Sequence, residues 1–464
     1  MTRNTGHAVH YGGCFPYGRR IASDRLSYGI SYNMAQFVIF LAAFCIRAIV
    51  VFRSAVHLSA DACVYDNLAR QIAGDGIISF RTIMNFPLKD HPVYPFFLSF
   101  LYAAFGPNYR LIWITQAAVG SLMCVLVYCT ARELLGRRTA IIAGLMAAGY
   151  PVFVKLSVMM LTEGLFIFMF VLSFWLLVKY INGLKLKYLL FSACAFGVTV
   201  LTRSVVLPFG LVVPLYLFLR NRKRLAFRAN GAHQALFIAV FICTILPWSI
   251  RNYFASGGQI IPVTEATDRG LYLSFCPVDG KIFGIKSDTD PVLVEARTIT
   301  SFDERRRFFM SKTREFIRNR PHEVVRLEIL KVAYLWSPID WEVLGNGAAR
   351  YNFGFVFILP FFIYGSVRLL RSGMQERFLL FLPILYFQAL HLVYFALPRF
   401  RVGFEPMLII LAGYGLQEGY ARARRKRVFA AGVIGFLLLN VLLWFFSAEL
   451  KCSLRWVCQA VGLW

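Results

Sequence analysis

The sequence predicts an all-α membrane protein that crosses the bilayer many times. Of its 464 residues, 58% are hydrophobic and the mean hydropathy is +0.60, whereas soluble domains are roughly 45–50% apolar. Apolar stretches of about 20 residues, the length that crosses the hydrocarbon, recur along the chain. Short loops rich in Lys and Arg follow every second stretch, which is typical of loops that stay in the cytoplasm.

We expect about eleven spans, near residues 35–56, 110–134, 139–157, 161–181, 187–204, 205–220, 234–250, 352–370, 378–396, 403–421 and 428–447. The stretch 187–220 contains Pro208 and is either a hairpin or a kinked pair of helices. These spans divide the chain into a cytoplasmic segment (1–34), an N-terminal transmembrane module (35–250) with a first outer loop (57–109), a second outer loop (251–350), C-terminal transmembrane helices (351–447) and an outer tail (448–464).

The two long outer loops are expected to contain helices. In the first, a helix from Asp61 to Ala73 is ended by Gly74-Asp75-Gly76. The apolar stretch Phe96–Phe105 is too short to span and is expected to lie in the membrane interface. The second loop offers amphipathic helices at 302–318 and 322–335. The side chains of the second of these that we expect on the membrane surface are Leu327, Leu330, Val332, Leu335 and Trp336.

Charge and cysteine content narrow the function classes. The net charge of +26 lies mostly in cytoplasmic loops, where it serves topology and contact with anionic lipid. No basic stripe with interleaved aromatic residues lies outside the membrane, so we expect the membrane but no nucleic acid as a partner. The ten cysteines form no CxxC or Cys/His metal spacing. Cys452 and Cys458 in the outer tail are a possible disulfide pair.

Four arginines lie on the side that the insertion rule leaves poor in positive charge: Arg203, Arg251, Arg399 and Arg401. The planar guanidinium group offers paired donors that suit a phosphate. Snorkelling to the interface explains one arginine at a helix end. Four on this side instead favour an anionic partner, such as a lipid headgroup or phosphate.

Acidic residues in the same region are candidates for proton transfer. Asp61 stands just beyond the first span, and Tyr65 follows one turn later on the same helix face. Asp61 is either a general base for a hydroxyl or a first-turn acid behind the helix cap Ser59. Glu163, at the outer end of the fourth span, either pairs with Arg203 or binds substrate.

A second polar group precedes Pro92 in the first outer loop. Lys89 is suited to neutralise a phosphate, and Asp90 or His91 to bind a sugar hydroxyl or assist proton transfer. The alternative is an ordinary solvated turn. The residues alone do not separate these two interpretations.

Taken in order, these residues resemble the polyprenyl-phosphate-sugar glycosyltransferases of the GT-C fold. The similarity is to glycosyltransferase family 39, in the branch of the protein O-mannosyltransferases and the lipid A aminoarabinose transferase, over residues 35–420. The motifs that carry it are Asp61-x-x-x-Tyr65-x-x-Leu68-Ala69, Gly74-Asp75-Gly76, His91-Pro92-x-Tyr94-Pro95, Thr162-Glu163, Leu201-Thr202-Arg203, Pro247-Trp248-x-x-Arg251-Asn252 and Arg399-Phe400-Arg401-x-x-x-Glu405-Pro406. One departure is His91-Pro92, where the family often has a basic residue before the proline.

The resemblance implies a GT-C fold and a polyprenyl-phosphate sugar as donor. Asp61 would be the general base, attack would invert the anomeric carbon, and the arginines with Lys89 would stabilise the departing phosphate. The other substrate-binding residues that we expect are Tyr65, Asp90, His91, Tyr94, Glu163, Asn252 and Glu405. No cofactor or metal is expected with certainty, although Asp61, Asp90 and Glu163 are suited to hold a divalent cation.

Sugar and acceptor stay open: a hexose or pentose, and a lipid A, polysaccharide, cell-wall polymer or protein hydroxyl. The location expected is a bacterial inner membrane with the site on the periplasmic face. One alternative is a transporter or flippase of lipid-linked sugars, which should show paired halves or helices broken at mid-membrane. Another is an O-antigen ligase or polymerase, whose key residues gather in a late loop. A non-catalytic scaffold is the third.

Overall fold

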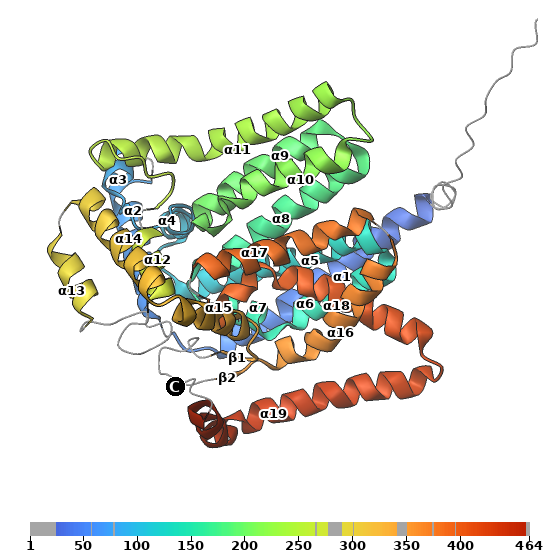
Figure 1. Ribbon diagram of the computed structural model, residues 1–464. Helices are drawn as coiled ribbons and strands as arrows, with labels where there is room; N and C mark the ends of the chain where they lie inside the picture. Colours follow the sequence, from blue (N-terminus) through green and yellow to red (C-terminus); the bar gives the residue numbers. More distant parts are fainter. Residues whose placement is uncertain are drawn as a thin grey trace, which may run out of the picture.

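The chain forms a bundle of long helices with shorter helices gathered at one end (Figure 1). The computed structural model describes residues 25–56, 58–77, 79–264, 267–276, 290–299, 301–340, 350–373, 375–394 and 396–460. The side chains of Cys452 and Cys458, which the sequence suggests as a pair, lie outside the described ones. With its helical spans and helical loops, the molecule has the all-α membrane architecture that the sequence predicts.

Helices occupy all eleven stretches that were predicted as spans. They are α1 (Arg25–Arg53), α5 (Tyr109–Leu135), α6 (Arg137–Gly149) followed by α7 (Pro151–Lys155) and η1 (Leu156–Val158), α8 (Thr162–Gly183), α9 (Leu186–Thr202), η2 (Ser204–Val206) followed by α10 (Phe209–Asn221), α11 (Phe227–Ala255), α16 (Phe353–Arg371), η3 (Gln375–Leu380) followed by α17 (Phe381–Val393), α18 (Glu405–Arg422) and α19 (Lys426–Ala460).

Length and composition let most of these helices cross a membrane by themselves. In the described part of the chain seven do so, and the α6–α7 pair, bent by 50°, makes an eighth. The other three predicted spans are α9 and α17, which are shorter, and α18, which carries charge at both ends. The 187–220 stretch is two helices, because the chain turns into η2 at Ser204 before Pro208 starts α10.

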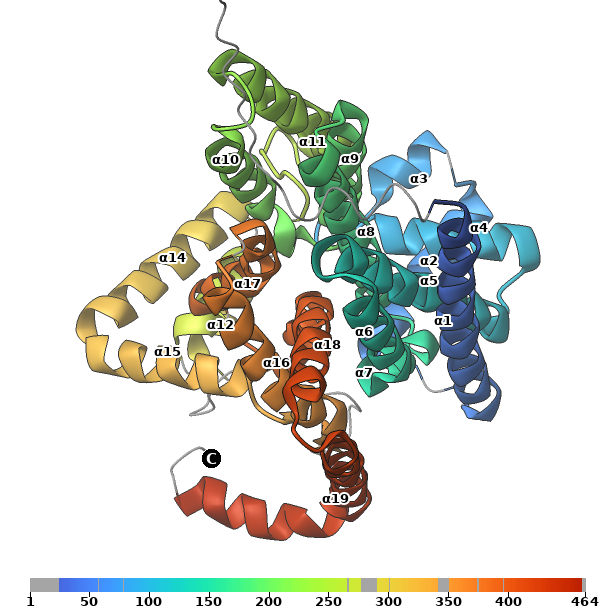
Figure 2. The same ribbon diagram turned by 90° about the vertical axis from the view of Figure 1, so that its right-hand side faces the viewer.

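The outer loops supply the short elements. They are α2 (Ala60–Asp75), α3 (Phe80–Asn85), α4 (Val93–Phe105), α12 (Thr267–Phe275), α13 (Pro291–Thr298), α14 (Phe302–Asn319), α15 (Pro321–Leu335), a two-stranded antiparallel ladder of β1 (Ile339–Asp340) with β2 (Arg350–Tyr351), and η4 (Pro398–Gly403). Seen along the long helices, α14 and α15 lie on one flank of the molecule and α2–α4 on the other (Figure 2).

Helix α2 matches its sequence signals. The Ser59 side chain accepts a hydrogen bond from the backbone N–H of Ala62, and the helix ends before Gly76, whose φ of 93° few other residues adopt. Asp66 fixes the middle of α2. Its buried carboxylate accepts hydrogen bonds from Tyr102 in α4, from Tyr109 in α5 and from Arg70. This network holds the first outer loop on the ends of the spans.

The surface of α15 differs from the expectation. Leu327 and Leu335 were predicted to lie on the membrane surface, but they are only 5% and 0% exposed. Helix α15 packs against α17 and η4, which turns that face of the helix inward. Val332 is exposed, as predicted, and it continues an exposed apolar row that begins with Val325 and Ile329.

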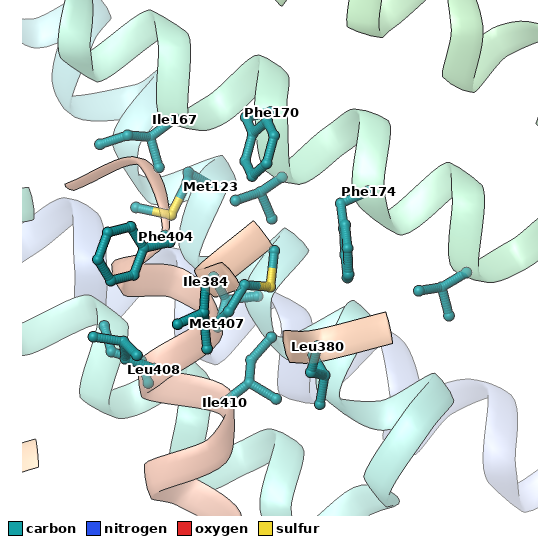
Figure 3. Packing of buried hydrophobic residues seen from close by; sticks show 14 of the residues in the cluster. Met123, Ile167, Phe170, Phe174, Leu380, Ile384, Phe404, Met407, Leu408 and Ile410 are labelled. Atoms are coloured by element: carbon teal, nitrogen blue, oxygen red, sulfur yellow. The ribbon is translucent and has the colours of Figure 1, made fainter. Parts of the chain in front are cut away.

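Aromatic and aliphatic side chains fill the space between α5, α8, α17 and α18. Figure 3 shows Phe170 and Ile167 of α8 facing Phe404 and Met407 of the last third of the chain. Phe170 and Phe387 meet at a ring-centroid distance of 5.8 Å. This core joins α8 to the last third of the chain directly below the cluster of charged residues.

Candidate active site at the outer ends of the spans

The site begins with Asp61 in the first turn of α2. Its side chain is 59% exposed, and Oδ2 lies 3.9 Å from Nη1 of Arg399 in η4. That distance is a loose ion pair rather than a closed hydrogen bond. Two charged groups from the first and last thirds of the chain thus face each other with the carboxylate still open to solvent.

A tighter ion pair lies beside them. Glu163 Oε1 at the start of α8 is 2.6 Å from Nη1 of Arg203, which also donates to the Thr162 hydroxyl at 3.1 Å. Glu163 is 7% exposed, and Arg399 lies within electrostatic range of it. The structure therefore brings Asp61, Glu163, Arg203 and Arg399 into one cluster.

Two aromatic rings, from Phe166 and Phe400, border Arg203. The guanidinium carbon lies 5.9 Å and 5.8 Å from the two ring centroids. Cation–π contact and the ion pair together restrict where this group points. The sequence analysis did not assign Phe166 a role, although its place one turn after Glu163 was a usable signal.

Tyr65 lines the same cluster from α2. Burial raises the pKa of Tyr65 to about 12. The positive charge of Arg203 opposes this shift, and the carboxylates of Glu163, Asp61 and Asp90 add to it. Its phenol therefore stays protonated and remains a donor at neutral pH. Its ring packs edge-on against Tyr94 at 5.4 Å. Tyr94 itself is 1% exposed, and its hydroxyl donates to Gln116 Oε1 at 2.7 Å. It therefore forms a fixed surface against which the Tyr65 ring packs.

The Lys89-Asp90-His91 turn completes the rim. Lys89 is exposed, and Asp90 is half-buried near Asp61. Burial raises the pKa of Asp90 above its ordinary value, although Lys89 opposes that shift. His91 contacts the residue after Arg203: its Nε2 lies 2.9 Å from the backbone nitrogen of Ser204 and 3.1 Å from its hydroxyl. Ser204 was not among the residues predicted from sequence.

Arg251 and Asn252 lie apart from the cluster. Arg251 donates through Nε to the Ile83 carbonyl at 2.7 Å and through Nη2 to the Met84 carbonyl at 2.8 Å and the Phe86 carbonyl. Asn252 accepts from Arg251 and holds the carbonyls of Ile261 and Val263, each at 3.0 Å. Both residues are 5% exposed or less. Their polar atoms bind the backbone of the outer loops.

Arg401 and Glu405 also form contacts that stabilise the fold. Both are buried, with Arg401 Nε 2.9 Å from Glu405 Oε1, which accepts from Tyr150 as well. Arg401 Nη1 donates to the carbonyls of Leu335 and Ser337, each at 2.9 Å. Within one motif, Arg399 faces the site and Arg401 faces the core.

In the described residues no three His, Cys, Asp or Glu side chains gather as a metal group. The set Asp61, Asp90 and Glu163, suggested by sequence for a divalent cation, therefore does not form a three-ligand site in this arrangement. The charges present are carboxylates interleaved with arginines, an arrangement that suits an anionic group beside a hydroxyl.

Comparison with known proteins shows what this chain is similar to. A model of the family described as dolichyl-phosphate-mannose-protein mannosyltransferase matches residues 89–248, about a third of the chain. No curated protein matches the sequence. The expected resemblance to glycosyltransferases of the GT-C fold is confirmed by the family match and by solved structures.

The solved structures show the fold. The oligosaccharyltransferase AglB from Archaeoglobus fulgidus, in complex with an inhibitory peptide and a dolichol-phosphate, is 14% identical with a TM-score of 0.52 over 92% of this chain and 56% of that one. Its apo form is 17% identical with a TM-score of 0.51 over 89% and 55%. This chain has the GT-C fold and spans about half the length of those structures. ArnT from Cupriavidus metallidurans is 13% identical with a TM-score of 0.37 over 86% and 80%.

Proposed function

We propose that this protein is an integral membrane glycosyltransferase that moves a sugar from a polyprenyl-phosphate donor to an acceptor hydroxyl. The observation that carries the proposal is the open carboxylate of Asp61 held 3.9 Å from Arg399, beside the Glu163–Arg203 pair at the ends of the spans. The description of the matching family names a dolichyl-phosphate sugar, and the AglB structure contains dolichol-phosphate. Both support a lipid phosphate as the leaving group.

The phosphate is assigned to Arg399. Its side chain is 34% exposed, and its partner Asp61 is only loosely engaged. Its Nε is buried and makes no hydrogen bond with the residues that the structure describes, and an unmet charged donor is costly. A phosphate oxygen would bind the exposed part of the same guanidinium group. Arg203, already paired with Glu163, adds a fixed positive charge close by, and exposed Lys89 is available at the rim.

Asp61 is the proposed base. It takes the proton of the acceptor hydroxyl while that oxygen bonds to the anomeric carbon and the carbon–oxygen bond to the phosphate breaks. The bonding pair leaves with the polyprenyl phosphate, whose new charge the arginines stabilise. Attack opposite the departing phosphate inverts the anomeric configuration. Tyr65 and Asp90 are then placed to contact the sugar hydroxyls.

The proposed setting is a bacterial inner membrane with the site on the periplasmic face. Lipid A, another envelope glycan or a protein supplies the acceptor hydroxyl, and the donor sugar is a hexose or pentose. Arg203 and Arg399 lie at one end of the bundle rather than at its middle. This placement favours a transferase over a transporter of lipid-linked sugars.

The test uses purified protein in nanodiscs with a panel of polyprenyl-phosphate sugars and mixed acceptors, and mass spectrometry of released polyprenyl phosphate. Wild type is expected to release it from one donor class. Asp61→Asn is expected to lose about 10²–10⁴-fold in rate, the usual loss for a general base. Asp75→Asn, an exposed acid at the other end of α2, is the matched control and should keep the wild-type rate.

Equal release by wild type and Asp61→Asn would remove Asp61 as the base. Tight binding of a lipid-linked sugar without any release, together with its movement across vesicle membranes, would replace the transferase with a transporter.

A further inference from the structure

One ring nitrogen of His91, Nε2, contacts the backbone and side chain of Ser204. A backbone N–H can only donate, so the 2.9 Å contact from Ser204 makes Nε2 of His91 the acceptor. The ring is therefore neutral and carries its proton on Nδ1. The Ser204 hydroxyl, 3.1 Å away, reaches the same nitrogen and also lies 3.5 Å from the hydroxyl of Thr264. One imidazole thus joins the first outer loop to the turn after α9.

That turn carries Arg203. Arg203 is the extended residue between α9 and η2, with φ of −152°, and Ser204 follows it directly. On the far side, the Tyr386 hydroxyl of α17 donates to the Val205 carbonyl. The backbone beside Arg203 is therefore held by hydrogen bonds with Tyr386 of α17 and with His91. Loss of either contact would loosen the backbone from which the Arg203 side chain extends.

We propose that His91 is a positioning residue that fixes Arg203 for phosphate stabilisation by accepting hydrogen bonds from Ser204, and that it does not bind the phosphate. This inference rests on the proposed function of the cluster. It replaces the substrate-binding role expected for His91 from sequence. With Nε2 accepting from Ser204, the ring is neutral and brings no positive charge to a phosphate. A small displacement of Arg203 has a large effect, because a 1 Å misplacement costs about 10²-fold in rate.

Three substitutions separate the two roles. His91→Gln keeps a side-chain acceptor near the place of Nε2, His91→Lys supplies a cation that only donates, and His91→Ala supplies neither. The first readout is kcat and KM for polyprenyl-phosphate release. The second, independent of catalysis, is mass-spectrometric labelling of Arg203 by phenylglyoxal, with exposed Arg81 as the internal reference.

We expect His91→Gln to stay within about threefold of wild type, and His91→Lys and His91→Ala to lose about 10–100-fold, mainly in kcat. Arg203 labelling should rise in those two variants and not in His91→Gln, while Arg81 labelling stays constant. Activity in His91→Lys with loss in His91→Gln would overturn the proposal and make His91 a phosphate ligand. Unchanged Arg203 labelling in all three variants would overturn it too. If wild type releases nothing from any donor, the proposed function fails, and the labelling still decides whether His91 holds Arg203.

Discussion

Arg399 and Arg401 illustrate how far two neighbouring side chains can differ in role. Both follow Leu397 in η4, where residues two apart do not share a face. Arg399 is partly exposed beside Asp61, whereas Arg401 is 0% exposed against Glu405 and the Phe355 ring. From the sequence, both are arginines on the side of the membrane that should lack them. Only the tertiary partners separate a site residue from a packing residue.

Arg401→Gln is expected to destabilise the protein strongly. It leaves the buried Glu405 carboxylate without its cationic partner, and breaking a buried pair costs about 3–5 kcal/mol. Thermal unfolding in detergent followed by tryptophan fluorescence measures this. An unchanged midpoint would show that Arg401 is not needed by the core.

Arg399→Gln is expected to behave in the opposite way. The residue is at the surface of the cluster, so the unfolding midpoint should stay near wild type. Polyprenyl-phosphate release should fall by about 10²–10³-fold, as when one fixed donor to a developing charge is removed. The Arg401→Gln protein, compared in the same melt, is the matched control. A folded Arg399→Gln protein with full activity would contradict the phosphate assignment.

His91 makes stability depend on acid. Burial, helped by Arg203 and opposed by Glu163, lowers its pKa from the ordinary 6.5 to about 3. At pH values between about 3 and 6.5, His91 is protonated in the unfolded chain and neutral in the folded chain. The free energy of unfolding therefore decreases as the pH falls from about 6.5 towards 3. Unfolding midpoints at pH 7, 5.5 and 4.5 should decline less steeply in His91→Gln than in wild type. Parallel declines would rule out His91 as a source of the effect.

At the scale of elements, buried cations repeatedly bind the carbonyl ends of other helices. Arg251 holds the end of α3, Arg401 that of α15, and Lys331 of α15 donates to the Leu392 carbonyl at the end of α17. In the bundle, Arg47 of α1 donates to the Ala148 carbonyl near the end of α6. The last turn of a helix exposes unpaired carbonyls and a partial negative charge, which a cation satisfies. Arg251 and Arg401, two of the four arginines predicted on the outer side, make contacts of this kind.

Arg251→Gln is expected to loosen α3. Three carbonyls of residues 83–86 lose a charged donor, so hydrogen exchange of amides in 80–90 should speed up by roughly tenfold or more, equivalent to about 1.5–3 kcal/mol for a charged hydrogen bond. Arg81→Gln, an exposed arginine on the same helix, is the control and should leave exchange unchanged. Equal exchange rates in the two variants would show that α3 stays folded without the hydrogen bonds from Arg251.

The elements could be predicted from the sequence far better than the site. Apolar length located the spans, and Ser59 with Gly76 located α2, because these signals are local. The Glu163–Arg203 pair was foreseen as one alternative, since both stand at outer ends of neighbouring spans. The sequence could not show that Arg251, Arg401 and Glu405 are structural residues rather than substrate-binding residues. Each role depends on which distant part of the chain lies next to the side chain. The same holds for Ser204, whose contact with His91 joins distant loops.

At the scale of the whole molecule, two glycines set how α16 and α18 cross. A Cβ on Gly365 would lie 2.1 Å from the Leu411 carbonyl oxygen, and one on Gly415 would lie 2.0 Å from that of Phe361. The backbones therefore touch, a packing that small residues permit between membrane helices. The close crossing keeps α18, and with it η4, against the rest of the bundle.

Gly365→Ala is expected to destabilise the bundle by about 1–3 kcal/mol, because backbone cannot move aside as a side chain does. The matched control is Gly435→Ala in α19, where an added Cβ meets nothing within 4 Å. Comparison of thermal unfolding in the same detergent checks both. Equal midpoints for the two variants would mean that α16 and α18 separate without cost.

The Asp61–Arg399 contact also bears on how the protein is made. Synthesis delivers the N-terminal third first, so Asp61 is present in the chain long before η4 is made. Until then the growing chain has the carboxylate without the arginine that faces it. Under the proposed roles of Asp61 and Arg399, catalytic competence arrives late in biogenesis, when η4 has docked beside α2. Under the proposed function, a chain whose translation stops before Leu397 lacks Arg399 and is expected to release no polyprenyl phosphate.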